Sequence, residues 1–359
     1  MYKYNEIKAV HLEITTKCNA RCPMCLRTVC GGKTNPNLPL VELSIEDVQK
    51  IFKPEFIRQL DRMYICGNYG DPIAAKDTLE VYKYFREQNP SIRLDMFTNG
   101  SARPTQWWQE LAKTIDSIHF SIDGLEDTNH LYRKGTNFPT IIESVKAYVG
   151  SGGKAIWDYI VFKHNEHQIE EARKLSEELG FHKFNVKKTG RFFSNTQMQG
   201  KNKQVVYDRS GEVDYYIEMP ENEKYQNKAL SKEQLLVEKY GSLESYLDKT
   251  PISCKVEAEK SMYMSAVGHA FPCCWTGNQL YPWYFPEGKS YMWKIVNQLE
   301  NGIDDLDAKK IDLEKIVNGP FFQKTLEASW GRPSIKEGRP KCCAKTCGTE
   351  FDPFKEQFS

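Results

Sequence analysis

The sequence predicts an α/β protein in which a partial (β/α)6 barrel of the TIM type is followed by a smaller, cysteine-rich α+β domain. The first half of the chain alternates apolar, strand-like segments with segments of helical periodicity, which is the pattern of a parallel sheet wrapped by helices. Cysteines return as a second group after residue 250. Since 359 residues are enough for two domains, we expect the barrel at 1–190, a polar linker or insertion at 191–250 and the cysteine-rich domain at 251–359.

Six apolar segments account for the predicted barrel sheet. These strands are expected at 9–14, 62–66, 93–97, 117–122, 155–162 and 183–186. Helices are expected between them, at 44–60, 78–88, 106–113, 140–150 and 166–179. Ser44 with Asp47 resembles a capping box at the start of the first helix, and Gly180 is a natural stop for the last. In barrels of this kind the chemistry takes place at the C-terminal ends of the strands.

The segment 194–250 is polar and rich in Lys, Glu, Gln, Asn and Tyr. One amphipathic helix is expected at 231–240, with Gly241 as its stop. Because charged runs are usually solvated, we interpret the segment as a linker or insertion rather than a lid that contacts substrate.

Composition and charge narrow the class of protein. The formal net charge is +1, so nothing in the charge balance indicates binding to nucleic acid or to an anionic membrane. No apolar run approaches the length of a membrane span, and the N-terminus lacks the apolar core of a signal peptide. Eleven cysteines without an export signal indicate metal or redox chemistry, so we expect a reducing, cytoplasmic location.

The most specific signal is a C-x3-C-x2-C spacing directly after the first predicted strand, formed by Cys18, Cys22 and Cys25. Three thiolates can hold a four-iron cluster and leave one iron open for a small molecule. A structural zinc site is the alternative, but zinc prefers four ligands and the nearest further candidates are Cys30 and His11. The spacing therefore favours an iron–sulfur cluster over zinc.

This arrangement resembles the radical S-adenosylmethionine (radical SAM) superfamily. In that family the open iron binds the amino and carboxylate groups of SAM. One electron from the cluster then splits the sulfonium, and the resulting 5′-deoxyadenosyl radical takes a hydrogen atom from the substrate. The resemblance therefore implies an enzyme with a 4Fe–4S cluster and SAM as cofactors, served by an electron donor such as flavodoxin or ferredoxin.

Short segments after the later strands extend the resemblance. Residues 67–72 are similar to the glycine-rich segment that lines the methionine end of SAM, 98–100 to the family's "TNG", and 121–124 to the segment that meets the ribose and carboxylate. Asp71 stands where Glu is usual, and Met24 stands where an aromatic residue usually borders the adenine. The resemblance assigns the following residues to SAM binding: Met24, Gly67, Asn68, Gly70, Asp71, Asn99, Ser121, Asp123, Arg133 and Asn165.

A second group of cysteines opens the C-terminal part. Its members are Cys254, the pair Cys273-Cys274, the pair Cys342-Cys343, and Cys347. Residues 254–273 read as a hairpin with a turn near Gly268, which brings the cysteines at its ends together. Four thiolates complete either an iron–sulfur cube or a zinc site, and the spacing leaves both open.

This part resembles a Twitch domain, the shortened form of the SPASM extension, which carries one auxiliary 4Fe–4S cluster. The resemblance implies Cys254, Cys273, Cys343 and Cys347 as its ligands. It favours Cys273 over Cys274 because a Pro-Cys ending is typical of that family's hairpin, and it likewise favours Cys343 over Cys342.

The expected activity is reductive cleavage of SAM and hydrogen abstraction from a small molecule or a peptide. A net oxidation with the auxiliary cluster as electron acceptor is favoured, and modification of a ribosomally made peptide is the alternative. A non-catalytic, metal-stabilised binding protein is the candidate from another class. Tyr64, His119, Lys163 and His164 are proton acceptors by residue type only, so no catalytic residue is assigned.

Overall fold

The computed structural model describes residues 1–194, 202–285 and 288–352. Its centre is an eight-stranded sheet with the order β10-β9-β1-β2-β3-β4-β5-β6, in which every pair of neighbours is parallel except β9 and β10. The barrel strands are β1 (Ala9–Leu12), β2 (Arg62–Ile65), β3 (Arg93–Thr98), β4 (Ser117–Ser121), β5 (Ala155–Ile160) and β6 (Lys183–Lys187). The predicted α/β class, partial barrel and six strands are confirmed.

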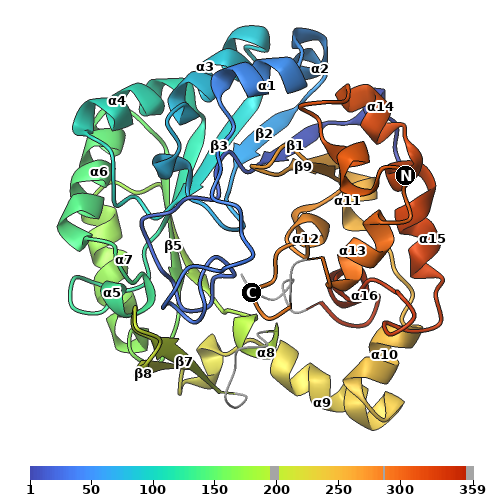
Figure 1. Cartoon of the computed structure of the whole chain (residues 1–359). Coiled ribbons are helices and arrows are strands. Elements are labelled where there is room, and N and C mark those ends of the chain that lie inside the picture. Colours follow the sequence, from blue (N-terminus) through green and yellow to red (C-terminus); the bar gives the residue numbers. More distant parts are fainter. Residues whose placement is uncertain (195–201, 286–287, 353–359) are drawn as a thin grey trace.

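Helices cover the outer face of this curved sheet (Figure 1). They are α1 (Ile45–Ile51), α2 (Pro54–Arg58), α3 (Thr78–Gln88), α4 (Thr105–Thr114), α6 (Phe138–Gly150) and α7 (Ile169–Glu178). The capping box of Ser44 and Asp47 is confirmed. The single helix predicted at 44–60 is wrong, because Pro54 lacks an N–H and disfavours helical backbone at Lys53, so the chain forms two helices instead.

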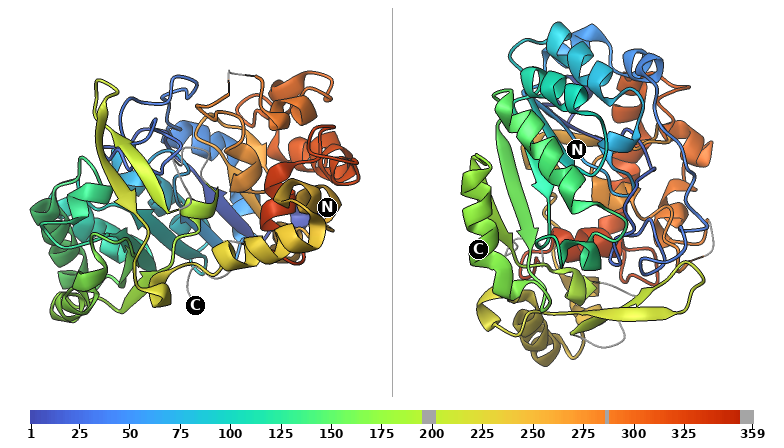
Figure 2. Two further views of the ribbon diagram at one scale, coloured as in Figure 1. Left: turned by 90° about the horizontal axis from the view of Figure 1, so that it is seen from below. Right: turned by 90° about the vertical axis from the view of Figure 1, so that its left-hand side faces the viewer.

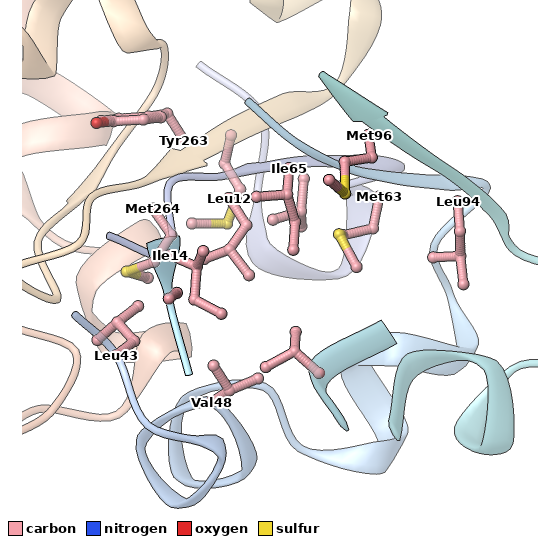
Figure 3. Packing of buried hydrophobic residues seen from close by; sticks show 14 of the residues in the cluster. Leu12, Ile14, Leu43, Val48, Met63, Ile65, Leu94, Met96, Tyr263 and Met264 are labelled. Atoms are coloured by element: carbon pink, nitrogen blue, oxygen red, sulfur yellow. The ribbon is translucent and has the colours of Figure 1, made fainter. Parts of the chain in front are cut away.

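Alternating strand residues build the core between sheet and helices. Leu12, Ile65 and Met96 are at most 1% exposed and point from neighbouring strands toward Val48 of α1 (Figure 3). Because side chains alternate across a strand, the intervening residues, such as His11, point toward the barrel interior. One set of positions therefore provides stability and the other is available for chemistry.

The cysteine-rich part extends the same sheet. Strand β9 (Ser261–Met264) pairs parallel with β1, and β10 (Ala270–Phe271) returns antiparallel, so the predicted hairpin is confirmed. Cys254 does not lie at the strand end as expected, because the short helix α11 (Lys255–Glu259) separates it from β9. The other helices of this part, at the right of Figure 1, are α12 (Cys274–Gly277), α13 (Tyr291–Val296), α14 (Leu313–Val317), α15 (Leu326–Trp330) and α16 (Lys341–Thr346).

The segment between these parts contains regular structure. A two-stranded ribbon, β7 (Lys203–Tyr207) and β8 (Val213–Glu218), projects beside the barrel (Figure 2). Two helices follow, α9 (Ala229–Tyr240) and α10 (Leu243–Lys249), and α9 ends at Gly241 with a φ of +82°, as predicted. No helix among the described residues is long and apolar enough to cross a membrane.

The barrel core provides a stability prediction. Leu12→Ala removes a fully buried side chain and should lower the free energy of unfolding by about 2–5 kcal/mol. The matched control is Leu40→Ala, since Leu40 is 52% exposed and should cost no more than about 0.5 kcal/mol. Urea unfolding followed by circular dichroism checks both, and equal losses would contradict the assigned core.

Candidate functional site

The loop after β1 carries the first three cysteines at the C-terminal edge of the sheet. The amide of Ala20 lies 3.3 Å from the Cys18 sulfur, and Nη1 of Arg133 lies 3.8 Å from the Cys22 sulfur. The Cys25 amide donates to the carbonyl of Cys22 at 3.1 Å, which makes a tight turn between these two residues. Amide and guanidinium hydrogens directed at sulfur favour thiolates, the form that binds iron.

Burial opposes ionisation of two of these thiols, those of Cys18 and Cys22. Desolvation, followed by the nearby charge of Asp71, holds the pKa of Cys18 well above its ordinary value. Desolvation also raises the pKa of Cys22, and Arg133 partly opposes it. Ligation by iron would displace the protons that the thiols otherwise keep.

Among the described residues, no three His, Cys, Asp or Glu side chains are close enough to share a single metal ion. In an iron–sulfur cluster each thiolate binds a different iron, so the three sulfurs need not converge.

The glycine-rich segment 67–71 lies against the cysteine loop. A Cβ at Gly70 would lie 1.8 Å from the carbonyl oxygen of Thr15, so only glycine fits there. Asp71 donates its amide to the carbonyl of Lys17 at 2.9 Å. Its carboxylate accepts the amide and the side-chain Nδ2 of Asn99, both at 2.8 Å. The structure therefore brings Gly70, Asp71 and Asn99 together beside the cysteines.

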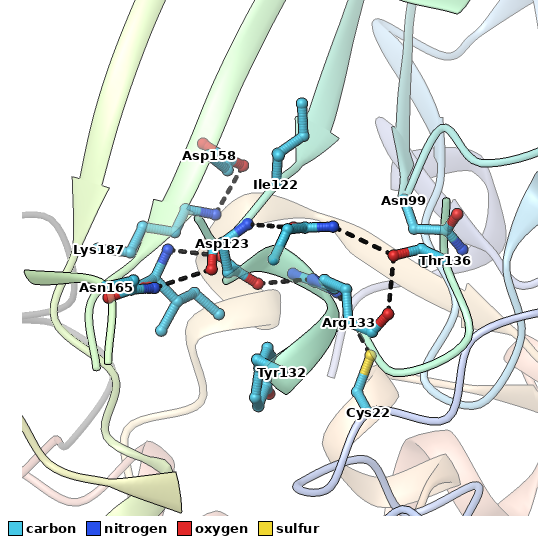
Figure 4. Close-up of polar contacts among 12 residues, drawn as sticks. Cys22, Asn99, Ile122, Asp123, Tyr132, Arg133, Thr136, Asp158, Asn165 and Lys187 are labelled. Atoms are coloured by element: carbon cyan, nitrogen blue, oxygen red, sulfur yellow. Dashed lines mark hydrogen bonds and ion pairs between the residues drawn. The ribbon is translucent and has the colours of Figure 1, made fainter. Parts of the chain in front are cut away.

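A second polar group lies at the ends of β4 and β5 (Figure 4). The fully buried Asp123 accepts Nε of Arg133 at 2.6 Å and the amide of Ile160 at 2.6 Å. Asn165 donates both hydrogens of its side chain to carbonyls, those of Asp123 and Ile160, and accepts the amide of Phe162. Asn165 thus ties two strand ends together, and its predicted contact with SAM stays a prediction.

Met24 and Ser121 are the remaining residues assigned to SAM. Met24 is buried beside Cys22 in an apolar cluster that includes Val206 and Ile217 of the β7–β8 ribbon. Ser121 is half-buried at the last position of β4. The ribbon from the predicted linker therefore packs directly on the first cysteine loop.

The second group of cysteines surrounds a cavity of about 190 Å³. The cavity is lined by Cys254, Cys273, Cys274, Cys343 and Cys347, which include all four expected ligands. Cys342 does not line it and lies with its sulfur 3.9 Å from that of Cys343. The hydrogen bond from Cys254 lowers the pKa of Cys347 to about 6.

His11 and Tyr64 of the barrel interior line the same cavity. Their rings stack with centroids 4.6 Å apart. The second cysteine site therefore borders the interior of the barrel.

One polar cluster inside the barrel, around Asp158, was not predicted from the sequence. Asp158 accepts Nζ of Lys187 at 2.7 Å and Nδ2 of Asn185 at 2.8 Å, and pairs with Nδ1 of His119 at 3.0 Å. Burial raises the pKa of Asp158, but the hydrogen bond from His119 and the charge of Lys187 outweigh it and bring the value to about 2. Polar residues at alternate positions of strands were the signal that could have revealed this cluster.

The other candidate proton acceptors lie in different surroundings. Lys163 forms ion pairs with Glu218 and Glu221 at 3.3 Å and 2.8 Å on the exposed surface. Burial lowers the pKa of His164 to about 4. Of the histidines and lysine named from residue type, only His119 is held by a carboxylate inside the barrel.

Residues 12–176 match the family model described as the Radical SAM superfamily. The match covers the cysteine loop, the glycine-rich segment and the ends of β3, β4 and β5.

Among curated proteins, the chain is similar to the FeMo cofactor biosynthesis protein NifB of Azotobacter vinelandii, with 33% identity over 119 residues, which is 32% of this chain and 23% of that protein. The chain spans between about a quarter and about a half of the length of the curated relatives that it matches.

Two solved structures share the fold over most of the chain. One is Streptococcus suis SuiB bound to the precursor peptide SuiA, with a TM-score of 0.54, 14% identity and coverage of 89% of this chain and 67% of that one. The other is anSMEcpe with bound AdoMet, with a TM-score of 0.51, 12% identity and coverage of 98% and 90%.

The Asp158 cluster provides a prediction on pH. Its folded-state pKa of about 2 lies below the ordinary value of 3.8, so Asp158 stabilises the fold above about pH 4 and loses this contribution as the pH falls toward 2. The difference corresponds to about 2 kcal/mol. Asp158→Asn should therefore be less stable than wild type at pH 7, and the gap should shrink below pH 4.

Urea unfolding of the metal-free protein at several pH values measures this gap. The matched control is the same substitution at the exposed Asp61, which should change stability little at any pH. A gap that stays constant between pH 7 and pH 2.5 would contradict the role of the Asp158 charge.

Proposed function

We propose that the chain is a radical SAM enzyme that uses a 4Fe–4S cluster and SAM. The observation that carries this proposal is the position of Cys18, Cys22 and Cys25 at the C-terminal edge of a partial barrel, against the glycine-rich segment 67–71. When bound, such a cluster supplies one electron that cleaves SAM to methionine and a 5′-deoxyadenosyl radical. The protein itself holds the three thiolates and presents backbone groups of the segment to the methionine end of SAM.

The other residues assigned to SAM support this use. Asp71 and Asn99 form a hydrogen bond beside the cysteine loop. The buried ion pair of Asp123 and Arg133 stabilises the loops at the ends of β4 and β5. Met24 supplies an apolar, polarizable surface beside Cys22 for the adenine.

We further propose a net oxidation, with a second 4Fe–4S cluster held by Cys254, Cys273, Cys343 and Cys347 in a Twitch/SPASM-like domain. Four cysteine ligands leave no iron open, which favours electron transfer over substrate binding. Support comes from the cavity that these residues line, since it borders the barrel interior at His11 and Tyr64.

A small molecule or a peptide could occupy the barrel. The shared fold with SuiB, solved with a bound precursor peptide, supports peptide modification as the second candidate. A flavodoxin or ferredoxin is the proposed electron donor. The eleven cysteines of the chain suit a reducing compartment, for which we propose the cytoplasm.

Anaerobic reconstitution with iron and sulfide tests the main proposal. The wild type should hold about eight irons per chain and the Cys18/Cys22/Cys25→Ala triple variant about four. With SAM and a reductant, only the wild type should form 5′-deoxyadenosine. Stoichiometric zinc without iron in either protein would overturn the enzyme and favour a metal-stabilised binding protein.

The second centre is tested by Cys347→Ala. This variant should lose about four irons yet still cleave SAM when SAM is saturating, because the first three cysteines are unchanged. Turnover of substrate should stop, since the electron acceptor is missing. Iron content and 5′-deoxyadenosine are measured together, and an unchanged iron count would contradict the ligand assignment.

A further inference from the structure

Glu13, the first residue after β1, carries a carboxylate that the predicted chemistry does not use. Its side chain is 1% exposed, and no ion pair to it occurs among the described residues. Three donors hold it instead. One carboxylate oxygen accepts the amides of Tyr69 and Gly70 at 2.6 Å and 3.2 Å, and the other accepts the hydroxyl of Tyr263.

These donors come from two distant parts of the chain. Tyr69 and Gly70 belong to the glycine-rich segment 67–71, whereas Tyr263 lies in β9, the first strand of the cysteine-rich part. The phenol of Tyr263 is itself 1% exposed. Glu13 therefore connects the segment proposed to bind SAM with the hairpin that leads to the second cysteine site.

Two further hydrogen bonds join the same parts. Asn68 donates Nδ2 to the carbonyl of Cys274 at 3.2 Å, and Tyr69 donates its hydroxyl to the carbonyl of Asn278 at 2.6 Å. On the opposite side, the carbonyl of Asn68 lies 3.9 Å from the sulfur of Cys25. Segment 67–71 is thus held between the two groups of cysteines.

All of these C-terminal partners fall within residues 263–278, and Cys273 lies in the middle of that stretch. A metal bound at Cys273 would restrict the backbone of the next residue, Cys274, whose carbonyl accepts the side chain of Asn68. A hydrogen bond to a buried charged group contributes more free energy than one between neutral groups, and it depends on direction. A shift of residues 263–278 would therefore move segment 67–71.

We propose that Glu13 and Tyr263 are positioning residues that couple the second cysteine centre to SAM binding, so that SAM binds tightly only when that centre holds its metal. This inference rests on the proposed function, since it takes segment 67–71 as part of the SAM site. At limiting SAM, the chain thereby binds and cleaves less SAM before the electron acceptor is in place.

The first test is the affinity of the fully loaded enzyme for SAM in the variant Tyr263→Phe. This change removes one hydroxyl and keeps the ring. The dissociation constant of SAM should rise about tenfold, equivalent to about 1.4 kcal/mol. Equilibrium dialysis under anaerobic conditions, at equal iron content, measures it.

The chain offers a matched control in Tyr2→Phe. Tyr2 is 2% exposed, and its hydroxyl donates to the carbonyl of Ser261, the first residue of the same strand β9. This variant loses the same atoms near the same hairpin but no contact to Glu13, so its affinity for SAM should stay within about twofold of wild type. Equal affinities of the two variants would overturn the coupling.

The second test asks whether the metal acts through this connection. Cys347→Ala should weaken SAM binding about tenfold, and adding Tyr263→Phe to it should weaken binding by less than a further twofold, because the two changes release the same contact. Full additivity would show that Tyr263 acts independently of the metal and would overturn the proposal.

A third variant and a second readout guard against misfolding. Tyr69→Phe removes the contact with Asn278 while every cysteine stays, and it should weaken SAM binding as well. In the fully loaded protein, the amides of Tyr69 and Gly70 should exchange with solvent faster in Tyr263→Phe than in Tyr2→Phe; equal exchange would count against the proposal. A wild type that does not bind SAM would overturn the proposed function, whereas normal SAM binding in Tyr263→Phe would overturn only this inference.

Discussion

The parallel pairing of β9 with β1 is the interaction on which the rest of the arrangement depends. It places Ala9 opposite Ser261 and Leu12 opposite Met264, so the cysteine-rich part continues the barrel sheet. The cysteine loop after β1 and the hairpin that leads to Cys273 therefore belong to neighbouring strands of one sheet. Because a register shift of one residue turns every side chain to the other face, this pairing also decides that Tyr263 points at Glu13.

The buried acidic residues around the barrel are stabilised in two ways. Asp123 and Asp158 each have a cationic partner, Arg133 and Lys187 respectively, which offsets the cost of removing the charges from water. Glu13 and Asp71 are stabilised by amide and hydroxyl hydrogens instead. Burial accordingly raises the pKa of Glu13 to about 7, although its hydrogen bonds oppose the rise. Among the described residues, the buried acids without an ion pair are Glu13 and Asp71, which lie in or contact segment 67–71.

Close backbone approach is the other device that builds the site. Gly67 and Gly70 let the segment fold onto itself and onto the cysteine loop at distances that any side chain would prevent. The β7–β8 ribbon closes the opposite side by packing Val206 and Ile217 near Cys22. Two separate stretches of the chain, the segment 67–71 and the β7–β8 ribbon, therefore pack against the first cysteine loop.

The local features of the protein could be predicted from the sequence alone: six apolar strands, most of the helices, the C-x3-C-x2-C loop after the first strand and the second group of cysteines. These depend on residues close together in the chain, whose period and spacing are readable without a fold. The helical pattern at 44–60 predicts one helix, whereas the structure has two helices divided before Pro54. Three features became visible only in the tertiary structure. Cys343 lines the cavity and Cys342 does not, and the side-chain amide of Asn165 donates to backbone carbonyls. Asp158 binds His119 and Lys187, which come from two other strands. The contact between Glu13 and Tyr263 joins residues 250 positions apart. The register between β1 and β9 creates it, and pairing across such a distance leaves no local pattern in the sequence.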